Sequence, residues 1–338
     1  MQKIRFIFRD SMNEYTYKLK EQGCRVWSIS RLNNFNTFRR QYYLTYIEKA
    51  RQKQGCYSLL GSSAHSDLED LYTSDSLQLV PKHFNEDWMK VELFNIPFPV
   101  SKGDIKGNYK KDMDTFYKYY KKMEGEFISE LGFLLQVSDK DWLMGYIDLI
   151  GLLDEDTVAV FDFKTSAMFK DKKLIDAGHQ LALYQMALEQ LYSLNIAING
   201  WIMLKYSDVQ IGTNKPMIGV QNKDLVKKCK TQIKKLMIKE GIDEAVADMY
   251  YLKCESENSF DSLPKDIQDK IHITTHFKPY EVTEEVKKET MEYITNTIAE
   301  IDKIDEKDID KWIKEGQEFF CQNLCSFLPK YCDGCKIN

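Results

Sequence analysis

Apolar and polar stretches alternate in the middle of the chain in a way that predicts a β-hairpin. Between Gly145 and Thr165, two runs of Ile, Leu, Val and Phe flank a turn of three consecutive acids. Apolar runs on both sides of a polar turn are typical of paired strands. If the turn is centred on Glu155, residues equally distant from it in the sequence lie opposite each other.

This register brings two acidic residues together, because Asp148 then faces Asp162. Directly opposed residues have Cβ atoms roughly 5 Å apart, so two ionised carboxylates there repel each other unless a cation lies between them. Lys164 is two positions from Asp162 and shares its face of the strand. The hairpin therefore predicts a metal site with a cationic side chain beside it. A shift of one residue in the register would place one acid on the other face.

The segments before the hairpin are predicted to be largely helical. Residues 1–27 are expected to form a connector with a short strand at 3–8. From Ser30, the expected N-cap, apolar residues recur at helical spacing as far as Tyr46. The opposite face of this helix is basic, and it either is solvated or lies at the edge of a DNA groove.

A second helix is predicted over residues 59–72, and it places His65 and Glu69 on one face. Gly61, together with the serines that follow it, would allow a ligand or the sheet to approach the helix closely. A histidine on a helix is either a structural, solvated side chain or part of a site, and the spacing alone leaves both open.

Residues 73–125 are expected to be an insertion. Its lysine-rich end, 106–122, predicts a helix whose basic face either is solvated or contacts a phosphate backbone. A strand is predicted over residues 127–137, leading into the hairpin. Within that strand Glu130 is either a further carboxylate of the site or an exposed acid.

After the hairpin, a helix over residues 174–192 and a strand over residues 199–206 are predicted. Gln180 and Tyr184 lie four positions apart in the helix and share a face. A strand, a helix and a strand in succession form a right-handed parallel unit. The core is therefore predicted to be α/β, with a central mixed β-sheet flanked by helices.

The last third of the chain is predicted to be mostly helical. Helix is expected over residues 222–255, with a lysine-rich stretch at 223–239, and again over residues 282–304. Residues 256–280 between them are expected to be a loop.

Composition sets limits on this picture. The chain has 338 residues, of which 43% are hydrophobic and 29% charged, and its net charge is -5. It can bury a sizeable core, but a nucleic-acid contact would need a local basic surface. No apolar run of about 18 residues predicts a membrane span. Residues 1–9 are too charged for a signal peptide, so a cytoplasmic protein without membrane partners is expected.

Half of the eight cysteines lie close together near the C-terminus, namely Cys321, Cys325, Cys332 and Cys335. In a reducing compartment such a cluster predicts one metal centre rather than disulfides. Four thiolates in a short span suit Zn²⁺ or an iron–sulfur cluster. Free buried thiols are the alternative.

Taken in order, these motifs resemble a known family. Gly61-x-x-x-His65-x-x-Leu-Glu69 is followed by Gly145-x-x-Asp148, then Asp162-Phe163-Lys164-Thr165, then Gln180-x-x-x-Tyr184. The succession resembles the RecB-type branch of the PD-(D/E)XK nuclease superfamily, which includes CRISPR-associated and phage exonucleases. It covers roughly residues 28–206. The resemblance implies a restriction-endonuclease-like core at 28–221, a helical region at 222–310 and a cysteine-cluster tail at 311–338.

The resemblance also implies a role for each matched residue. Asp148, Asp162, the backbone carbonyl of Phe163 and the imidazole of His65 would bind catalytic Mg²⁺ or Mn²⁺, and oxygen-rich ligand sets suit these ions. Lys164 would position the attacking water and offset charge on the scissile phosphate. Gln180 and Tyr184 would order the site and contact the DNA strand, while the role of Glu69 is left open.

Many RecB-type nucleases hold a four-cysteine iron–sulfur cluster with one ligand before the histidine motif and three near the C-terminus. This sequence departs from that pattern, since Phe38 stands where an early cysteine is expected. All four ligands are therefore expected in the tail, holding a [4Fe-4S] cluster or, alternatively, Zn²⁺. The tail would fasten the C-terminus to the nuclease core.

The expected function is that of a metal-dependent DNA exonuclease acting on ends or single strands, in recombination, repair or phage DNA metabolism. One alternative is a structure- or site-specific endonuclease of the same fold, and another is a nuclease-like DNA-binding module without catalysis. No Gly-x-x-x-x-Gly-Lys-Ser/Thr loop occurs in the sequence, so a helicase motor or recombinase would be a separate partner.

Overall fold

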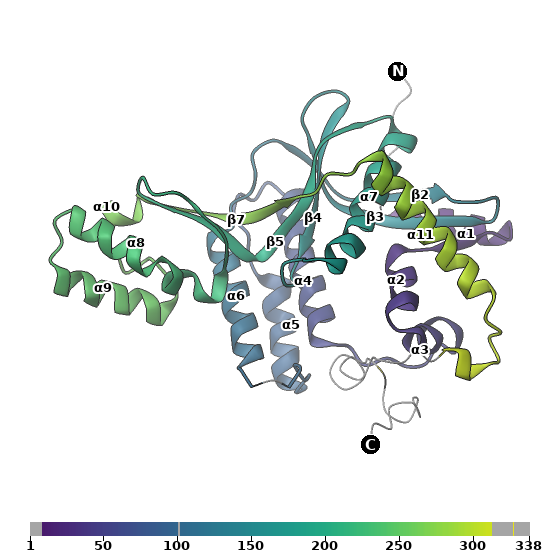
Figure 1. The fold of residues 1–338 in the computed structure, drawn as a ribbon, viewed down its shortest axis with the longest axis horizontal. Helices are drawn as coiled ribbons and strands as arrows, with labels where there is room; N and C mark the ends of the chain where they lie inside the picture. The colour runs from purple at the N-terminus through teal and green to yellow at the C-terminus, as the bar shows by residue number, and fades with distance from the viewer. Residues whose placement is uncertain (1–8, 101, 313–326, 328–338) are drawn as a thin grey trace.

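A computed structural model describes residues 9–100, 102–312 and 327, and it shows a mixed seven-stranded sheet flanked by helices (Figure 1). The strands are β1 (Arg25–Trp27), β2 (Glu126–Gln136), β3 (Asp141–Leu152), β4 (Thr157–Lys164), β5 (Asn195–Ile211), β6 (Met217–Gln221) and β7 (Ile271–Pro279). The longer helices are α1 (Arg9–Glu21), α2 (Ile29–Thr37), α4 (Cys56–Thr73), α5 (Lys82–Leu93), α6 (Ile105–Tyr119), α7 (Lys172–Tyr192), α8 (Leu225–Lys239), α9 (Glu244–Glu257) and α11 (Glu284–Asp302). Short helical turns are α3 (Arg39–Tyr42), η1 (Tyr43–Ile47), η2 (Asn222–Asp224), α10 (Lys265–Gln268) and η3 (Ile309–Trp312).

The predicted hairpin is formed by β3 and β4, and its register is confirmed where the strands pair. Leu149 lies opposite Phe161, as a turn centred on Glu155 requires. The side chain of Asp154 closes the turn by accepting backbone hydrogen bonds. Pairing ends at Leu149, so Asp148 lies at the point where the two strands begin to diverge.

The predicted α/β architecture is confirmed. Strand β4 runs parallel to β5, and α7 connects the two. Strand β2 pairs antiparallel with β3 along nearly its whole length, and β1 joins β3 in parallel near its start. On the other side of the sheet β6 and β7 both pair antiparallel with β5. The sheet is therefore mixed, with the hairpin near its centre.

Two apolar cores cover the two faces of the sheet. One lies beneath α2, α7 and α11 and includes Val160 of β4, whereas the other lies beneath α4 and α6 and includes Phe163 of the same strand. Full burial of such a side chain contributes roughly 1.5–3 kcal/mol relative to exposure. Strand β4 is thus anchored on both faces. This packing fixes the position of Asp162, which lies between Val160 and Phe163 in the strand.

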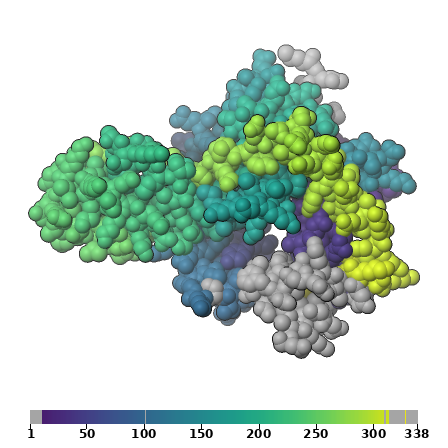
Figure 2. Space-filling view, in the orientation of Figure 1, coloured from purple at the N-terminus to yellow at the C-terminus, as the bar shows by residue number. Residues whose placement is uncertain are grey.

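A third apolar core forms a separate lobe. It combines residues of α8, α9 and α10 with the far ends of β5 and β7, among them Val209 and Ile211. In Figure 1 this lobe extends to one side of the sheet, and Figure 2 shows it as a projecting body. Because β5 runs from the central sheet into the lobe, a continuous strand connects the two.

Three expectations about the N-terminal part are wrong. Residues 9–21 form α1 and residues 25–27 form β1, where a connector was expected; the strand expected at 3–8 lies outside the described residues. The cap of α2 is Ser28, whose extended backbone lets its hydroxyl accept the N–H of Arg31 at 3.2 Å. Ser30 is already inside the helix. The helix expected to continue to Tyr46 is broken at Phe38.

The loop expected at residues 256–280 is also wrong in part, because it contains β7. Ile271, Ile273 and Thr275 alternate with His272 and other polar residues, and this two-residue period is typical of a half-buried strand. Strand β7 pairs with β5 from Ile211 back to Gly200. The range 222–310, expected to be helical, therefore supplies a strand to the central sheet.

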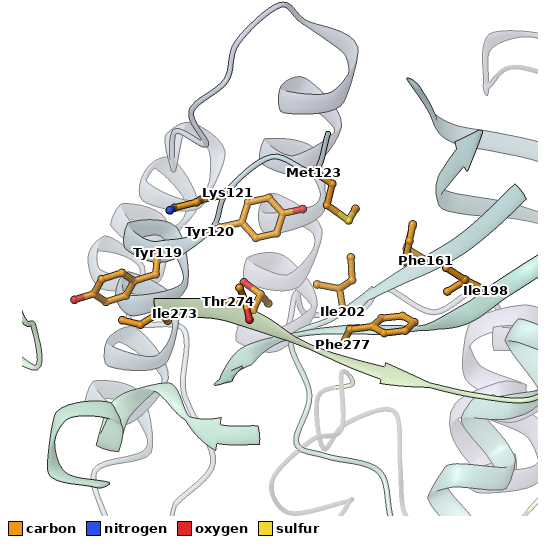
Figure 3. Close-up of a pocket in the computed structure, with 11 residues that line it drawn as sticks. Tyr119, Tyr120, Lys121, Met123, Phe161, Ile198, Ile202, Ile273, Thr274 and Phe277 are labelled. Atoms are coloured by element: carbon orange, nitrogen blue, oxygen red, sulfur yellow. The ribbon is translucent and has the colours of Figure 1, made fainter. Parts of the chain in front are cut away.

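An apolar pocket of about 350 Å³ opens between the α6–β2 connection and strands β4, β5 and β7 (Figure 3). Tyr120, Phe161 and Phe277 are among its lining residues, and none of the predicted nuclease-site residues lines it. Among the helices of the described ranges, none is long and apolar enough to cross a membrane.

Candidate active site

Asp148 lies at the fork where β3 and β4 separate. Its Oδ2 accepts a hydrogen bond of 2.8 Å from the backbone N–H of Phe163. Its carbonyl oxygen accepts a second bond, of 3.1 Å, from the hydroxyl of Ser129 on β2. A buried strand N–H needs an acceptor, and here a side chain supplies it. The carboxylate is therefore held in one orientation while the strands diverge.

Glu130 faces Asp148 from the neighbouring strand. In the antiparallel register of β2 and β3, Ser129 lies opposite Leu149 and Leu131 opposite Ile147, which leaves Glu130 opposite Asp148. Glu130 has a positive φ of 53°, a conformation that costs a non-glycine residue roughly 1–2 kcal/mol. Such strain is concentrated at functional sites.

The strained residue also changes which face the strand presents. Ile128 and Leu131 pack against the same core although they are three positions apart. A regular strand alternates its faces, so an odd separation requires a break, and Glu130 lies within it. The same odd separation occurs in β3 between Ile147 and Ile150. The break in alternation coincides with the two facing acids.

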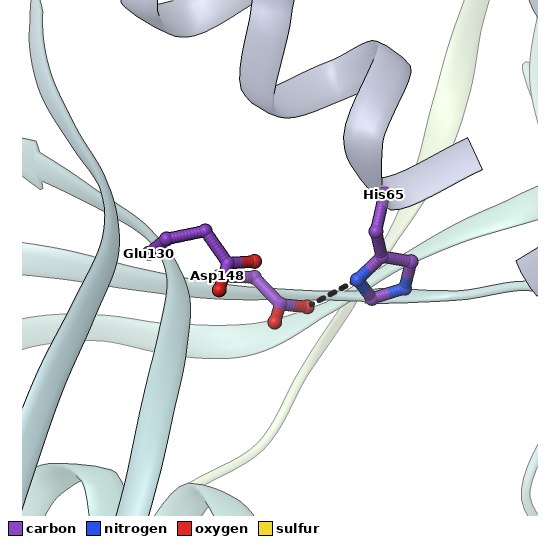
Figure 4. Close-up of side chains that lie close together, drawn as sticks. All are labelled: His65, Glu130 and Asp148. Atoms are coloured by element: carbon purple, nitrogen blue, oxygen red, sulfur yellow. Dashed lines mark ion pairs between the residues drawn. The ribbon is translucent and has the colours of Figure 1, made fainter. Parts of the chain in front are cut away.

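Helix α4 brings His65 to this pair. Its Nδ1 lies 3.4 Å from Asp148 Oδ2, and the ligand atoms of His65, Glu130 and Asp148 all lie within 4.8 Å of one another (Figure 4). One turn earlier in α4, a Cβ at Gly61 would lie 3.3 Å from Thr165 Oγ1. The glycine therefore allows the helix to approach the end of β4, as the sequence predicts.

A small pocket of about 230 Å³ opens beside His65 and Glu130. Its walls are Gly61, Ser62, His65, Ser66, Glu69 and Glu130. The structure thus places Glu69 at the site, one helical turn from His65 along α4. It also places Glu130 there, which the sequence left open. The sequence does contain a signal for Glu130. Glu130 and Asp148 are equally distant along the chain from the β2–β3 connection, so in a hairpin they lie opposite each other.

Asp162 lies next to this cluster and is fully buried. Its Oδ2 is 2.6 Å from Nζ of Lys164, while no described residue donates a hydrogen bond to Oδ1. Burial raises the pKa of Asp162 to about 6; the charge of Lys164 opposes this shift, and the charge of Asp148 adds to it. A buried carboxylate oxygen without a donor, next to other acids, is well suited to bind a cation.

Lys164 is connected to α7 through a chain of hydrogen bonds. Its Nζ donates to Gln180 Oε1 at 3.0 Å, and Gln180 Nε2 donates to the hydroxyl of Tyr184 at 2.5 Å. Burial lowers the pKa of Lys164, but the carboxylates of Asp162 and Asp148 more than offset it, so the net pKa is raised. Burial and the same two acids raise the pKa of Tyr184 well above its usual value.

The structure therefore brings the predicted residues into one region, but it does not place all the predicted metal ligands in one cluster. His65 and Asp148 cluster with Glu130, whereas Asp162 is buried against Lys164. Metal binding by the Phe163 carbonyl stays a prediction. Cys321, Cys325, Cys332 and Cys335 lie outside the described residues. Of the other cysteines, Cys56, Cys229 and Cys254 are buried free thiols.

A forked mixed sheet that gathers three carboxylates, an imidazole and a lysine is the arrangement of a metal-dependent nuclease. In agreement, the sequence model of the PD-(D/E)XK nuclease superfamily matches residues 26–336, and the chain belongs to this superfamily. Its members are nucleases that act on DNA and typically use Mg²⁺ or Mn²⁺. The match extends beyond the motifs themselves, through the lobe and α11. No curated protein matches the sequence at a significant level.

Proposed function

We propose that this nuclease is a Mg²⁺- or Mn²⁺-dependent exonuclease that hydrolyses phosphodiester bonds at DNA ends or in single strands. The observation that supports a catalytic site, rather than a binding module, is Asp162, a fully buried acid that is ion-paired with Lys164 and whose pKa is raised by burial and shifted by the charges of Asp148 and His65. Burying an ionisable acid beside other acids costs free energy of folding. Its presence here therefore favours a catalytic role over a purely structural one. The exonuclease assignment rests on the resemblance of the motif order to RecB-type exonucleases.

The donor atoms at the fork fit a divalent cation. Carboxylate oxygens of Asp148 and Glu130 and a nitrogen of His65 already lie within 4.8 Å of one another and would hold it. Asp162, outside that group, would add its buried Oδ1, which has no hydrogen-bond donor among the described residues. When bound, such an ion would activate a water molecule and stabilise charge on the phosphoryl oxygens.

The protein's own groups prepare the site for this chemistry. The raised pKa of Lys164 keeps its ammonium protonated at neutral pH, so it acts as a cation near the scissile phosphate and not as a general base. Gln180 accepts a hydrogen bond from that ammonium and fixes its direction. Tyr184, which remains a neutral phenol, holds Gln180 in turn.

The decisive assay uses the purified full chain with Mg²⁺ or Mn²⁺ and end-labelled linear or closed circular DNA, single- or double-stranded. Cleavage of linear DNA with circles left intact is expected of an exonuclease. Cleavage of circles would favour the structure- or site-specific endonuclease. DNA binding without any cleavage would leave only the non-catalytic module.

The four C-terminal cysteines are proposed to hold one metal centre, a [4Fe-4S] cluster or alternatively Zn²⁺. Their support is the spacing in the sequence and the resemblance to iron–sulfur nucleases. A brown preparation that absorbs near roughly 400 nm, an expectation for thiolate-bound iron, would indicate the cluster. A colourless protein with one zinc per chain would indicate Zn²⁺. A protein that contains neither iron nor zinc would indicate free thiols.

The proposed setting is DNA recombination, repair or phage DNA metabolism in the cytoplasm of a bacterium or an infected host cell. A helicase or recombinase is the proposed partner, since the sequence carries no phosphate-binding loop of a motor. Co-purification with a DNA-stimulated ATPase would support that partner.

A further inference from the structure

Helix α8 in the lobe carries six lysines and no acidic residue. Its buried residues, among them Val226, Ile233 and Met237, face the core of the lobe. At 3.6 residues per turn, the exposed Lys227, Lys228, Lys235 and Lys239 fall within an arc of about 120° on the opposite side. From the first to the last they span about 18 Å along the helix axis. We call these four residues the lysine stripe.

The other two lysines of α8 have partners within the lobe. Lys230 lies over the ring of Tyr251, 4.8 Å from its centroid, and Lys234 is ion-paired with Asp248 of α9. None of the lysine stripe forms an ion pair with any residue in the described ranges. The stripe is therefore an exposed row of positive charge in a chain whose net charge is -5.

The far end of the stripe borders a hollow of about 380 Å³. Lys235 and Lys239 line it together with Lys270 and His272, and the β5–β6 turn adds Thr213 and Asn214. Its two acids are already engaged, Glu240 by Lys270 at 2.5 Å and Asp269 by Lys265 at 2.9 Å. The hollow thus combines uncompensated ammonium groups with hydroxyl and amide donors, a set that suits a phosphate group.

Strand β5 relates this surface to the catalytic site. Asp162 pairs with Trp201 of β5, and the strand then runs ten residues further to Ile211, where the lobe begins. At 3.3 Å per residue this strand length is at most about 33 Å, close to one helical turn of DNA, about 34–36 Å. The next residue, Gly212, lines the same hollow as Lys235 and Lys239, so the length extends from the site to that end of the stripe. Strand β7 pairs with β5 over most of this length, so the separation is held by a paired ribbon.

We propose that the lysine stripe is a second DNA-binding site, which contacts the phosphate backbone of a duplex about one helical turn from the bond that is cleaved. This proposal rests on the proposed nuclease function for the position of the cleaved bond. It assigns the lobe a role in holding the double-stranded part of the substrate.

The test compares full-length variants by their affinity for DNA in a chelating buffer, where binding is measured without cleavage. Replacing the stripe with glutamine (Lys227→Gln, Lys228→Gln, Lys235→Gln, Lys239→Gln) is expected to weaken binding of a duplex of about three helical turns by at least tenfold. The slope of log affinity against log salt should fall by about 0.9 for each phosphate that a lysine no longer neutralises. A matched control replaces four exposed lysines elsewhere, Lys20, Lys140, Lys288 and Lys303, and changes the net charge equally.

A second variant separates charge from folding. Arginine at the four stripe positions should retain the wild-type affinity and salt slope, because the phosphate contact requires only positive charge. In cleavage assays with metal, the wild-type protein should have a lower KM for long duplexes than for duplexes shorter than one turn. The glutamine variant should lose this difference, because its KM for the long duplexes is raised. Equal affinities of the glutamine variant and the control variant would overturn the proposal. If instead binding falls as expected while the wild-type protein cleaves no DNA, the lobe assignment stands and the nuclease proposal fails.

Discussion

Asp148 and Phe163 are joined by a hydrogen bond of 2.8 Å between a carboxylate oxygen and a strand N–H. The bond forms one step beyond the last backbone pair of the β3–β4 hairpin. A side chain of the site therefore stabilises the fork of the sheet, and the fork in turn fixes the side chain. The geometry of the fork and the orientation of the Asp148 carboxylate depend on the same hydrogen bond. A substitution of Asp148 should therefore affect both the sheet and the site.

Substitution of either member of the Asp162–Lys164 ion pair should strongly slow cleavage. Asp162→Asn removes the charge that would hold a cation, and Lys164→Ala removes the ammonium beside the phosphate, so each should slow cleavage by at least about 100-fold. The rate on end-labelled DNA with Mg²⁺ measures the effect. Glu155→Gln, in the exposed turn of the same hairpin, is the control and should behave as wild type. If both site variants remain fully active, the site is wrongly assigned.

Removal of the Glu130 charge should weaken metal binding. Glu130→Gln leaves the shape of the side chain but takes one anionic oxygen from the cluster with His65 and Asp148. The Mg²⁺ concentration for half-maximal cleavage should rise about tenfold or more, with less change in the rate at saturating metal. Glu126→Gln, in the same strand, is the matched control. Identical Mg²⁺ titrations for the two variants would remove Glu130 from the metal site.

The strained backbone at Glu130 should appear in the stability of glycine variants. Glycine normally destabilises a strand, but at φ +53° it also relieves the left-handed strain. Glu130→Gly should therefore cost less free energy of unfolding than Glu126→Gly, by about 1 kcal/mol. Urea denaturation of the metal-free proteins gives both values. Equal destabilisation by the two substitutions would show that the conformation at Glu130 carries no strain.

The pH dependence of cleavage should reflect Asp162. Its pKa is raised to about 6, so the carboxyl is protonated below that pH and ionises as the pH rises. Activity at limiting Mg²⁺ should therefore increase through about pH 6. Because a cation binds only the ionised form, higher Mg²⁺ should move this acid limb to lower pH. A limb that stays at the same pH at every Mg²⁺ concentration would contradict the assignment.

Acid should loosen the packing of α11 on α7 through His179. Its ring stacks on Tyr293, 4.5 Å between centroids, and its Nδ1 lies 3.0 Å from Thr290 Oγ1. Burial lowers the pKa of His179, and the charges of Asp176 and Glu289 oppose the shift only in part. The unfolded chain therefore binds the proton more readily, and stability falls as the pH decreases through about 6.5.

Thermal unfolding at a series of pH values tests this histidine. The midpoint of His179→Gln should depend less on pH between about 7.5 and 5.5 than the wild-type midpoint does. A His179 variant with the full acid sensitivity of the wild type would show that another group is responsible.

Patterns of residues along the chain were sufficient to predict the parts of the site that lie close together in the sequence. The turn at Glu155 fixed the register of the hairpin, since strand pairing next to a short turn leaves little choice. Helical periodicity placed His65 beside Glu69 and Gln180 beside Tyr184, because residues four apart share a face. The order of these motifs was enough to predict the α/β fold and the nuclease superfamily.

Contacts between distant segments of the chain determine which of these residues meet in the site. Glu130 joined the cluster because its strand leaves regular geometry at that residue, a local break that periodicity does not reveal. Strand β7 entered the sheet because the long strand β5 offered an unpaired edge far away in the sequence. Burial separated Asp162, held against Lys164, from the open cluster around Asp148. Spacing in the sequence determines which face a residue occupies, whereas the contacts between distant segments determine its depth, its partners and its pKa.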